Sequence, residues 1–276
     1  MKIGLYGINI GPCSEPEVIA EATRRAEAAG LDSVWTAEHV VLPDPQAPPS
    51  PSPPHMKLLD PAVALGFAAA HSTTIKLATG IVILPQRNPV VAAKEFATVD
   101  RLSNGRLVFG VAAGYLHQEF EAVGVPFGER GKRCDDYIEA IRTLWTDQQP
   151  VFEGRYIRFG GIQQQPPPVQ QPHPPIVVGG MSDAALDRAA RLGDGWYGFA
   201  LDVDATRTCL NKLRAHPELK QKPDFETSLS PLGLPDAELA RRYEDLGLDR
   251  LVVTPFARTA DDLWRAIDHA AGLAAS

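Results

Sequence analysis

Two titratable side chains, Glu38 and His39, stand side by side where the apolar run 34–37 ends and a proline-rich tract begins. Histidine side chains titrate near neutral pH and suit proton transfer, and a neighbouring carboxylate can orient or charge the imidazole. Because successive residues of a strand point to opposite sides, only one of the two is expected to face a substrate directly. The alternative is that both make only structural hydrogen bonds at the end of a strand.

Two glycine-containing segments suggest places where a ligand approaches the backbone. In residues 107–120 the small residues Gly110, Ala112, Ala113 and Gly114 follow an apolar run, and in residues 177–185 Gly179-Gly180 precedes a helical pattern. Backbone N–H groups and the helix dipole at such a helix start favour a phosphate group. Neither segment is a complete nucleotide-binding fingerprint, so a tight turn that merely needs glycine remains an alternative.

A third segment, residues 75–84, places Gly80 inside a strand-like run. A glycine within a strand often marks a bulge or the close approach of a ligand. Arg87 follows this run, where it could pair with a carboxylate or a phosphate, or serve as an ordinary salt-bridge partner.

The elements that must position these residues alternate regularly between strand-like and helical patterns. Each strand-like run is followed by a helical pattern, and the strand-like runs are 2–8, 33–37, 75–84, 106–112, 175–180, 194–200, 224–231 and 249–256. Eight such units predict one α/β domain over residues 1–276, a single (β/α)₈ TIM barrel; a doubly wound open sheet is the alternative. The first helix is expected to begin at a capping box formed by Ser14 and Glu17, with Pro16 in its first turn, and to end at Gly30.

Two segments exceed what a barrel needs. The tract 43–61 follows the second strand and is rich in proline, which favours an extended loop; we expect a lid over the active-site face rather than a solvated loop. The segment 150–174 precedes the fifth strand and predicts a β-hairpin followed by a proline-rich linker.

The net charge, the apolar runs and the cysteine content exclude several classes of protein. The net charge of −7 and the pI near 5.5 argue against nucleic-acid binding, which requires clustered Lys and Arg. No apolar run is long enough to span a membrane, and the start of the chain shows no signal-peptide pattern. Three scattered cysteines match neither a disulfide framework nor a zinc-binding spacing, so no metal is expected and a cytoplasmic protein is predicted.

Several stretches together resemble one known family. They are GLYG, EAAGLDSVWTAEHVVLP, the block from Leu77 to Tyr115, FEGRYIRF, PHPPIVVGG and RLGDGWYGF. The chain resembles the bacterial luciferase-like oxidoreductases, and more closely their branch that depends on the deazaflavin coenzyme F420.

The resemblance implies a cofactor ring at the C-terminal face of the barrel. A bulge in the third strand, commonly with a non-prolyl cis peptide, would back the ring, and its counterpart here is Gly80-Ile81. In such dehydrogenases the acid that matches Glu38 touches the cofactor, and the histidine that matches His39 acts near the transferred hydride. The counterparts of the residues that contact the cofactor phosphate are Ala113, Gly114, Gln118, Val178, Gly179, Gly180 and Met181.

One departure concerns the position after Gly114. Sugar-phosphate dehydrogenases of the family carry a catalytic glutamate there, whereas this chain has Tyr115. Their basic residues for a substrate phosphate have no clear counterpart either, so a glucose-6-phosphate dehydrogenase is not expected. Tyr115 could donate a proton or stack against a ligand.

The sequence therefore predicts an oxidoreductase that transfers a hydride between F420 and an unidentified small organic substrate. One alternative is a monooxygenase of the same family that uses reduced FMN. The alternative of another class is a barrel that binds a cofactor without catalysis. Members of the family often pair, so a homodimer is possible, although no sequence feature marks an interface.

Overall fold

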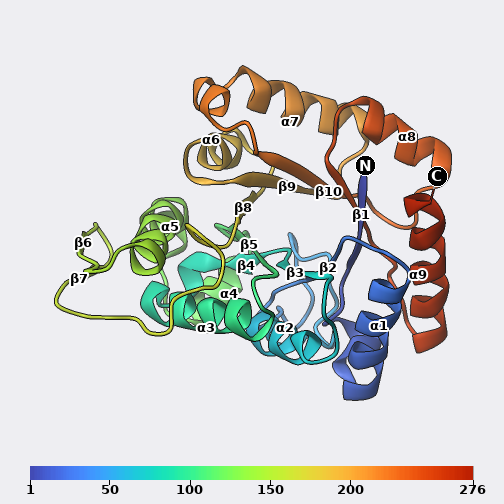
Figure 1. Cartoon of the computed structure of the whole chain (residues 1–276), viewed down its shortest axis with the longest axis horizontal. Helices are drawn as coiled ribbons and strands as arrows, with labels where there is room; N and C mark the ends of the chain where they lie inside the picture. The colour runs from blue at the N-terminus through green and yellow to red at the C-terminus, as the bar shows by residue number, and fades with distance from the viewer. Residues whose placement is uncertain (276) are drawn as a thin grey trace.

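The strands of the computed structural model, which describes residues 1–275, close into a parallel barrel (Figure 1). The barrel strands, in chain order, are β1 (Lys2–Tyr6), β2 (Ser33–Thr36), β3 (Lys76–Thr79), β5 (Leu107–Ala112), β8 (Ile176–Gly179), β9 (Gly195–Phe199), β10 (Glu226–Ser230) and β11 (Arg250–Val253). A two-residue strand, β4 (Val82–Ile83), continues β3 beyond a break. The pairings β3–β5 and β1–β11 complete the ring, so the TIM barrel is confirmed and the open sheet is excluded.

A ring of helices surrounds the strands in Figure 1. The helices are α1 (Pro16–Ala28), α2 (Pro61–Ala69), α3 (Pro89–Leu102), α4 (His117–Ala122), α5 (Arg130–Thr146), α6 (Asp183–Leu192), α7 (Val203–Ala215), α8 (Ala237–Asp245) and α9 (Ala260–Ala274). Short 3₁₀ turns are Gly11–Ser14, Leu84–Gln86, Phe127–Glu129 and Pro217–Gln221. Within residues 1–275, no helix combines the length and the apolar character that a membrane crossing requires.

The predicted capping box at the start of α1 is wrong. The Ser14 hydroxyl belongs to the preceding 3₁₀ turn, where it donates to the carbonyl of Gly11 at 2.8 Å, and the N-cap residue Glu15 makes no side-chain capping bond. A capping box does occur at α9, between Thr259 and Asp262. The Ser14 hydroxyl therefore bonds within the turn that precedes the helix and does not cap the helix.

The interior of the barrel is filled by side chains rather than hollow. Trp35 and Tyr197 stack with ring centroids 4.9 Å apart, within a buried cluster completed by Ala78, Val108, Val177 and Val252. Tyr6, Ile81 and Phe199 pack against this cluster and are only partly buried. A Cβ atom at Gly110 would overlap the carbonyl oxygen of Thr79, so this position requires glycine. A ligand can therefore bind at the mouth of the barrel but not within it.

The N-terminal end of the barrel is closed by the buried side chain of Arg250. Its Nε donates to Asp32 at 2.6 Å, its Nη1 donates to the Ser228 hydroxyl at 3.1 Å, and its Nη2 lies 2.9 Å from a carboxylate oxygen of Glu226. Burial alone would raise the pKa of both carboxyls, but Arg250 lowers the pKa of Asp32, and Lys2 together with Arg250 lowers the pKa of Glu226. One cation thus connects the starts of β2, β10 and β11.

Both predicted insertions are present. The hairpin of β6 (Phe152–Glu153) and β7 (Arg158–Phe159) precedes β8 and projects from the helix ring (Figure 1). The proline-rich loop after β2 is anchored at both ends by the buried Asn9, whose Nδ2 donates to the carbonyls of Ala37 at 2.9 Å and Leu59 at 2.6 Å. Whether this loop acts as a lid stays a prediction.

Replacing Arg250 should destabilise the protein measurably. We expect Arg250→Met to lower the free energy of unfolding by about 3 kcal/mol at pH 7, the low end for a broken buried ion pair, because both carboxylates keep some contact with water. The loss should shrink as the pH falls below about 4, where the carboxyls protonate and no longer need the cation. Urea denaturation measures it.

The matched control is Arg207→Met, which breaks an exposed ion pair with Asp204 on α7. This variant should cost less than about 1 kcal/mol. An equal loss for the two variants would contradict the role assigned to Arg250.

Candidate active site

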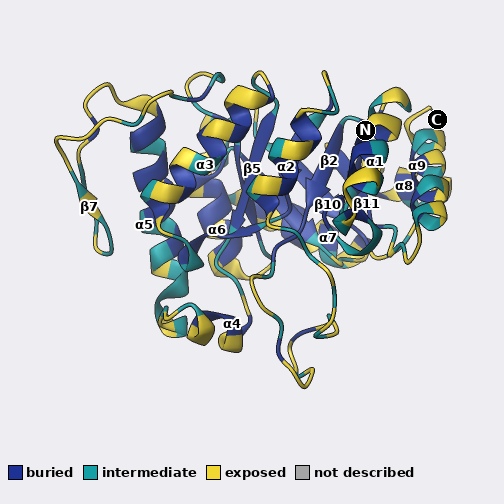
Figure 2. Cartoon of the chain, turned by 90° about the horizontal axis from the view of Figure 1, so that it is seen from below, coloured by how far each residue is buried: buried dark blue, intermediate teal, exposed yellow. Residues whose placement is uncertain are grey.

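The mouth of the barrel brings together the segment after β2 and the segment after β5. In Figure 2 the helix α4, which follows β5, lies at one end of the barrel, clear of the strands. His39 from the first segment contacts Tyr115 and Glu119 from the second. The contacting residues are 76 and 80 positions apart in sequence, and they meet because β2 and β5 both pair with β3.

Glu38 turns away from His39 and into the protein. Its side chain is 2% exposed, and its carboxylate accepts the backbone N–H of Ile83 and two N–H groups of the Arg87 guanidinium. Arg87 also pairs with Asp60 at 2.6 Å and with Glu95 at 3.3 Å. The prediction that the two side chains face different ways therefore holds, and Glu38 joins β2 to the second half of the broken third strand.

Burial and neighbouring charges shift the pKa values of Glu38 and Arg87. Burial raises the pKa of the Glu38 carboxyl, and the contacts with Arg87 and Ile83 oppose that rise. Burial lowers the pKa of Arg87, but the carboxylates of Glu38 and Asp60 outweigh this effect and raise it above its ordinary value. Arg87 therefore stays charged and fully engaged, which makes it a salt-bridge partner rather than a phosphate ligand in this structure.

His39 lies between a carboxylate and a phenol. Its Nδ1 is 3.2 Å from Oε2 of Glu119, and its Nε2 is 3.3 Å from the hydroxyl of Tyr115, whose ring meets the imidazole edge-on. The other oxygen of Glu119 accepts the backbone N–H of Val40 at 2.6 Å. The carboxylate, the imidazole and the phenol therefore form one line of polar contacts.

The sequence analysis missed Glu119. It is only 1% exposed, although it is charged, because it occupies the apolar face of α4 between the fully buried Leu116 and Phe120. A carboxylate at such a position needs polar partners, and here His39 and Val40 supply them. An acid within an i, i+3, i+4 apolar stripe was the available signal.

Tyr115 reaches the mouth and remains a neutral phenol near pH 7. Its side chain is 43% exposed, the highest exposure of the three contacting residues. Burial of part of the ring raises the pKa of the Tyr115 hydroxyl, and the negative charge of Glu119 raises it further. Burial also raises the pKa of Tyr6, which is electrostatically coupled to Tyr115. The mouth thus holds two phenols beside one imidazole.

The floor of the mouth is formed at the break in the third strand. The Gly80–Ile81 peptide is cis, as the resemblance implies. A Cβ atom at Gly80 would come within 3.0 Å of Trp35 and 3.3 Å of the Thr36 carbonyl, so no larger residue fits without a shift. The Ile81 side chain extends over Gly179, where a Cβ atom would lie 2.9 Å from it. The floor is therefore apolar and continuous with the barrel core.

Two adjacent turns offer backbone N–H groups at this floor. Gly114 and Gly180 have φ angles of +80° and +125°, which favour glycine. Among residues 1–275, no backbone acceptor is found for the N–H groups of Gly114, Met181 and Ser182, which precede helices α4 and α6. This arrangement fits a phosphate group. The predicted phosphate contacts Ala113, Gln118, Gly179 and Met181 lie in the same two segments, whereas the buried Val178 could contribute only its backbone.

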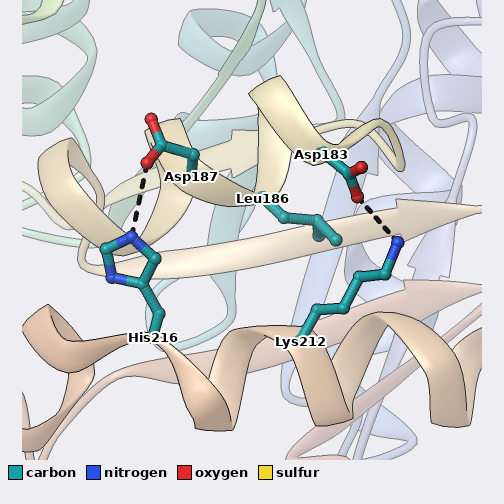
Figure 3. Close-up of a pocket in the computed structure, with 5 residues that line it drawn as sticks. All are labelled: Asp183, Leu186, Asp187, Lys212 and His216. Carbon is teal, nitrogen blue, oxygen red and sulfur yellow. Dashed lines mark hydrogen bonds and ion pairs between the residues drawn. The ribbon is translucent and has the colours of Figure 1, made fainter.

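A separate surface pocket lies between α6 and α7 (Figure 3). Lys212 forms an ion pair with Asp183 at 2.7 Å, and His216 lies 3.3 Å from Asp187, so each of these side chains has a polar partner. No predicted site residue lines this pocket, so the mouth of the barrel remains the candidate active site.

Comparison with known proteins finds related sequences over most of the chain. Residues 9–231 match the model of a family described as luciferase-like monooxygenase. An uncharacterised protein of Mycobacterium tuberculosis is 33% identical over 93% of this chain and 94% of its own length. An FMNH(2)-dependent dimethylsulfone monooxygenase of Pseudomonas putida is 35% identical over 52% of this chain and 41% of its own.

A solved structure shares the fold over almost the whole chain. It is an F420-dependent secondary alcohol dehydrogenase in complex with an F420–acetone adduct, with a TM-score of 0.80 and 17% identity over 99% of this chain and 97% of that one. At this identity the likeness concerns the fold alone.

The pairing of Glu38 with Arg87 yields a prediction with a defined pH dependence. Arg87→Met leaves a buried carboxylate without its cation, so the pKa of Glu38 should rise further. The free energy of unfolding should then fall by about 3 to 5 kcal/mol at pH 8 and by less at pH 5, where a protonated Glu38 no longer needs the cation. Urea titrations at both pH values measure this.

The double variant Arg87→Met/Glu38→Gln provides the control, because it removes the buried charge as well. Its deficit relative to the wild type should be nearly independent of pH. A single variant whose deficit does not change with pH would contradict the assignment.

Proposed function

Because the chain belongs to the luciferase-like monooxygenase family, we propose that it is an F420-dependent oxidoreductase acting on a small organic substrate. The observation that carries this proposal is that Glu38 and His39 lie in different surroundings and make different contacts. The acid is buried and engaged by Arg87, while the imidazole stands at the mouth with a phenol beside it. Proton transfer at the mouth then accompanies hydride transfer by a bound cofactor.

The residues present fit such a cofactor. The apolar floor at Gly80 and Ile81 suits one face of a flat ring. The N–H groups of Gly114, Met181 and Ser182, for which residues 1–275 supply no backbone acceptor, suit its phosphate. A bound deazaflavin supplies hydride chemistry, giving or accepting two electrons together. Both turns lie at the ends of neighbouring strands, β5 and β8, so one ligand can reach both from the floor.

The protein's own part is to orient, shield and move a proton. Tyr6 on β1, Ile81 in the break between β3 and β4, and Phe199 on β9 present apolar surface, which excludes water from below a bound ring. Nε2 of His39 is the atom at which a proton is held or released, either directly or through Tyr115. Positioning the substrate carbon against the cofactor supplies much of the remaining rate enhancement.

A second candidate is a monooxygenase that uses reduced FMN. The half-chain identity of 35% to the dimethylsulfone monooxygenase favours it specifically. The apolar floor and the phosphate turns would serve either cofactor, because both carry a tricyclic ring and a phosphate. The two candidates therefore differ in which cofactor binds and in whether product formation consumes oxygen.

Direct titration separates the two candidates. We expect F420 to bind with a dissociation constant on the order of micromolar or lower, and FMN to bind at least about tenfold more weakly. Fluorescence of each cofactor follows binding in both oxidation states. A preference for FMN, with product formed only when oxygen is present, would reverse the choice. Tight binding of F420 without turnover over a broad substrate panel would favour a non-catalytic barrel.

The turn before α6 provides a second test. Gly180→Ala places a methyl group at φ +125°, with its Cβ 2.7 Å from that of Ala185, so the turn must shift. Cofactor binding should weaken by about tenfold or more, corresponding to about 1.4 kcal/mol. Calorimetric titration with F420 measures this loss.

Gly66→Ala on α2 is the matched control, since nothing lies within 4 Å of its new Cβ atom. We expect unchanged cofactor affinity for this variant. Unchanged affinity for Gly180→Ala as well would remove the turn from the cofactor site.

A further inference from the structure

His39, from the segment after β2, meets Tyr115 and Glu119, from the segment after β5, in one line at the mouth. We propose that they form a single proton-transfer chain whose outer end, the Tyr115 hydroxyl, meets the substrate, with Glu119 as a positioning residue. The inference rests on the proposed function, since a redox cofactor must supply the accompanying hydride step. It assigns the substrate contact to Tyr115 and identifies the group behind the histidine.

The inner end of the chain fixes the tautomer of His39. A carboxylate only accepts hydrogen bonds, and one oxygen of Glu119 is already taken by the N–H of Val40 at 2.6 Å. The other oxygen faces Nδ1 of His39 at 3.2 Å, so Nδ1 must carry the proton of the neutral ring. Nε2 is then an acceptor and points toward Tyr115.

The outer end of the chain is the phenol. The Tyr115 hydroxyl lies 3.3 Å from Nε2, so it donates its proton to that nitrogen and keeps its lone pairs for a substrate hydroxyl. The His39 side chain is 11% exposed and Tyr115 is 43% exposed, which places the phenol between the imidazole and the mouth. A substrate therefore meets Tyr115 before it meets His39.

The proton movement balances for an alcohol or a ketone. In the oxidation of an alcohol, the substrate hydroxyl proton passes to the oxygen of Tyr115 while the phenolic proton passes to Nε2 of His39. The hydrogen on the same carbon leaves as a hydride with two electrons, which the deazaflavin accepts, and a ketone results. The imidazolium that forms faces the carboxylate of Glu119, which offsets its charge. Ketone reduction runs the same transfers backwards.

Ionisable side chains from four segments of the protein lie near the proton-transfer chain. Glu119 from α4 and Tyr115 from the loop after β5 face His39, and Tyr6 from β1 is coupled electrostatically to Tyr115. The neighbouring Glu38 is directed to Arg87 instead. The carboxylate of Glu119 is therefore the anion in direct contact with the imidazole.

Nitrogen-15 NMR of the histidine side chains tests the proton-transfer chain. The protein is studied without cofactor, at a pH where the imidazole is neutral. In the wild type, Nδ1 of His39 should carry the proton; the His39→Gln variant identifies its resonances among those of the seven histidines. In Glu119→Gln the amide oxygen should keep the Val40 N–H, so the amide NH₂ faces Nδ1 and the proton should move to Nε2. Tyr115→Phe should keep the tautomer but shift the Nε2 resonance.

Kinetics with F420 provide the second measurement. We expect Glu119→Gln and Tyr115→Phe each to lower kcat about 100-fold with little change in KM, because proton transfer rather than binding is lost. Glu121→Gln, at an exposed position of the same helix, should leave both the tautomer and kcat unchanged. If Glu119→Gln does not fold, Tyr115→Phe decides, since its side chain is partly exposed and its replacement removes only a hydroxyl.

The outcomes separate this inference from the proposed function. A proton on Nε2 in the wild type, an unchanged tautomer in Glu119→Gln, or full turnover in both variants would overturn the chain even if F420 supports catalysis. The predicted tautomers together with no binding of F420 would uphold the tautomer assignment and overturn the proposed function.

Discussion

The carboxylate of Glu38 is the interaction on which the geometry of the mouth depends. It joins the end of β2 to the N–H of Ile83, beyond the break in the third strand, and to the guanidinium of Arg87, which follows the 3₁₀ turn before α3. A break in a buried strand leaves backbone groups that need partners, and this carboxylate supplies one of them. With the acid fixed inward, its neighbour in the chain must face outward, so the position of His39 follows from the bonds of Glu38.

The two ends of the barrel handle buried charge differently. At the N-terminal end one guanidinium, Arg250, meets two carboxylates that retain some access to water. At the mouth one guanidinium, Arg87, meets three carboxylates, so the local charge is negative. An anionic ligand therefore gains little from Arg87, and backbone N–H groups at the glycine turns are one source of attraction.

The barrel followed from the sequence because strict alternation of strand and helix patterns leaves few ways to close a parallel sheet. Glu38, His39 and the glycine turns also followed, because they stand at strand ends that meet at one face. Glu119 did not follow from the sequence, because α4 has only six residues and because the role of Glu119 depends on a contact with His39, which lies 80 positions away. The failed capping box at Ser14 has a similar origin, because the preceding turn, folded by longer-range packing, captured the serine hydroxyl.

Asn9 gives the proline-rich loop a property that matters beyond stability. One buried side chain holds the loop where it leaves the barrel, at Ala37, and where it returns, at Leu59. The part of the loop beyond Val40, residues 41–56, can be exchanged, lengthened or shortened without disturbing the residues that hold His39 in place. Selection can therefore alter the surface of this loop without altering the barrel, so the loop can diverge among descendants of one ancestral barrel while the fold is inherited.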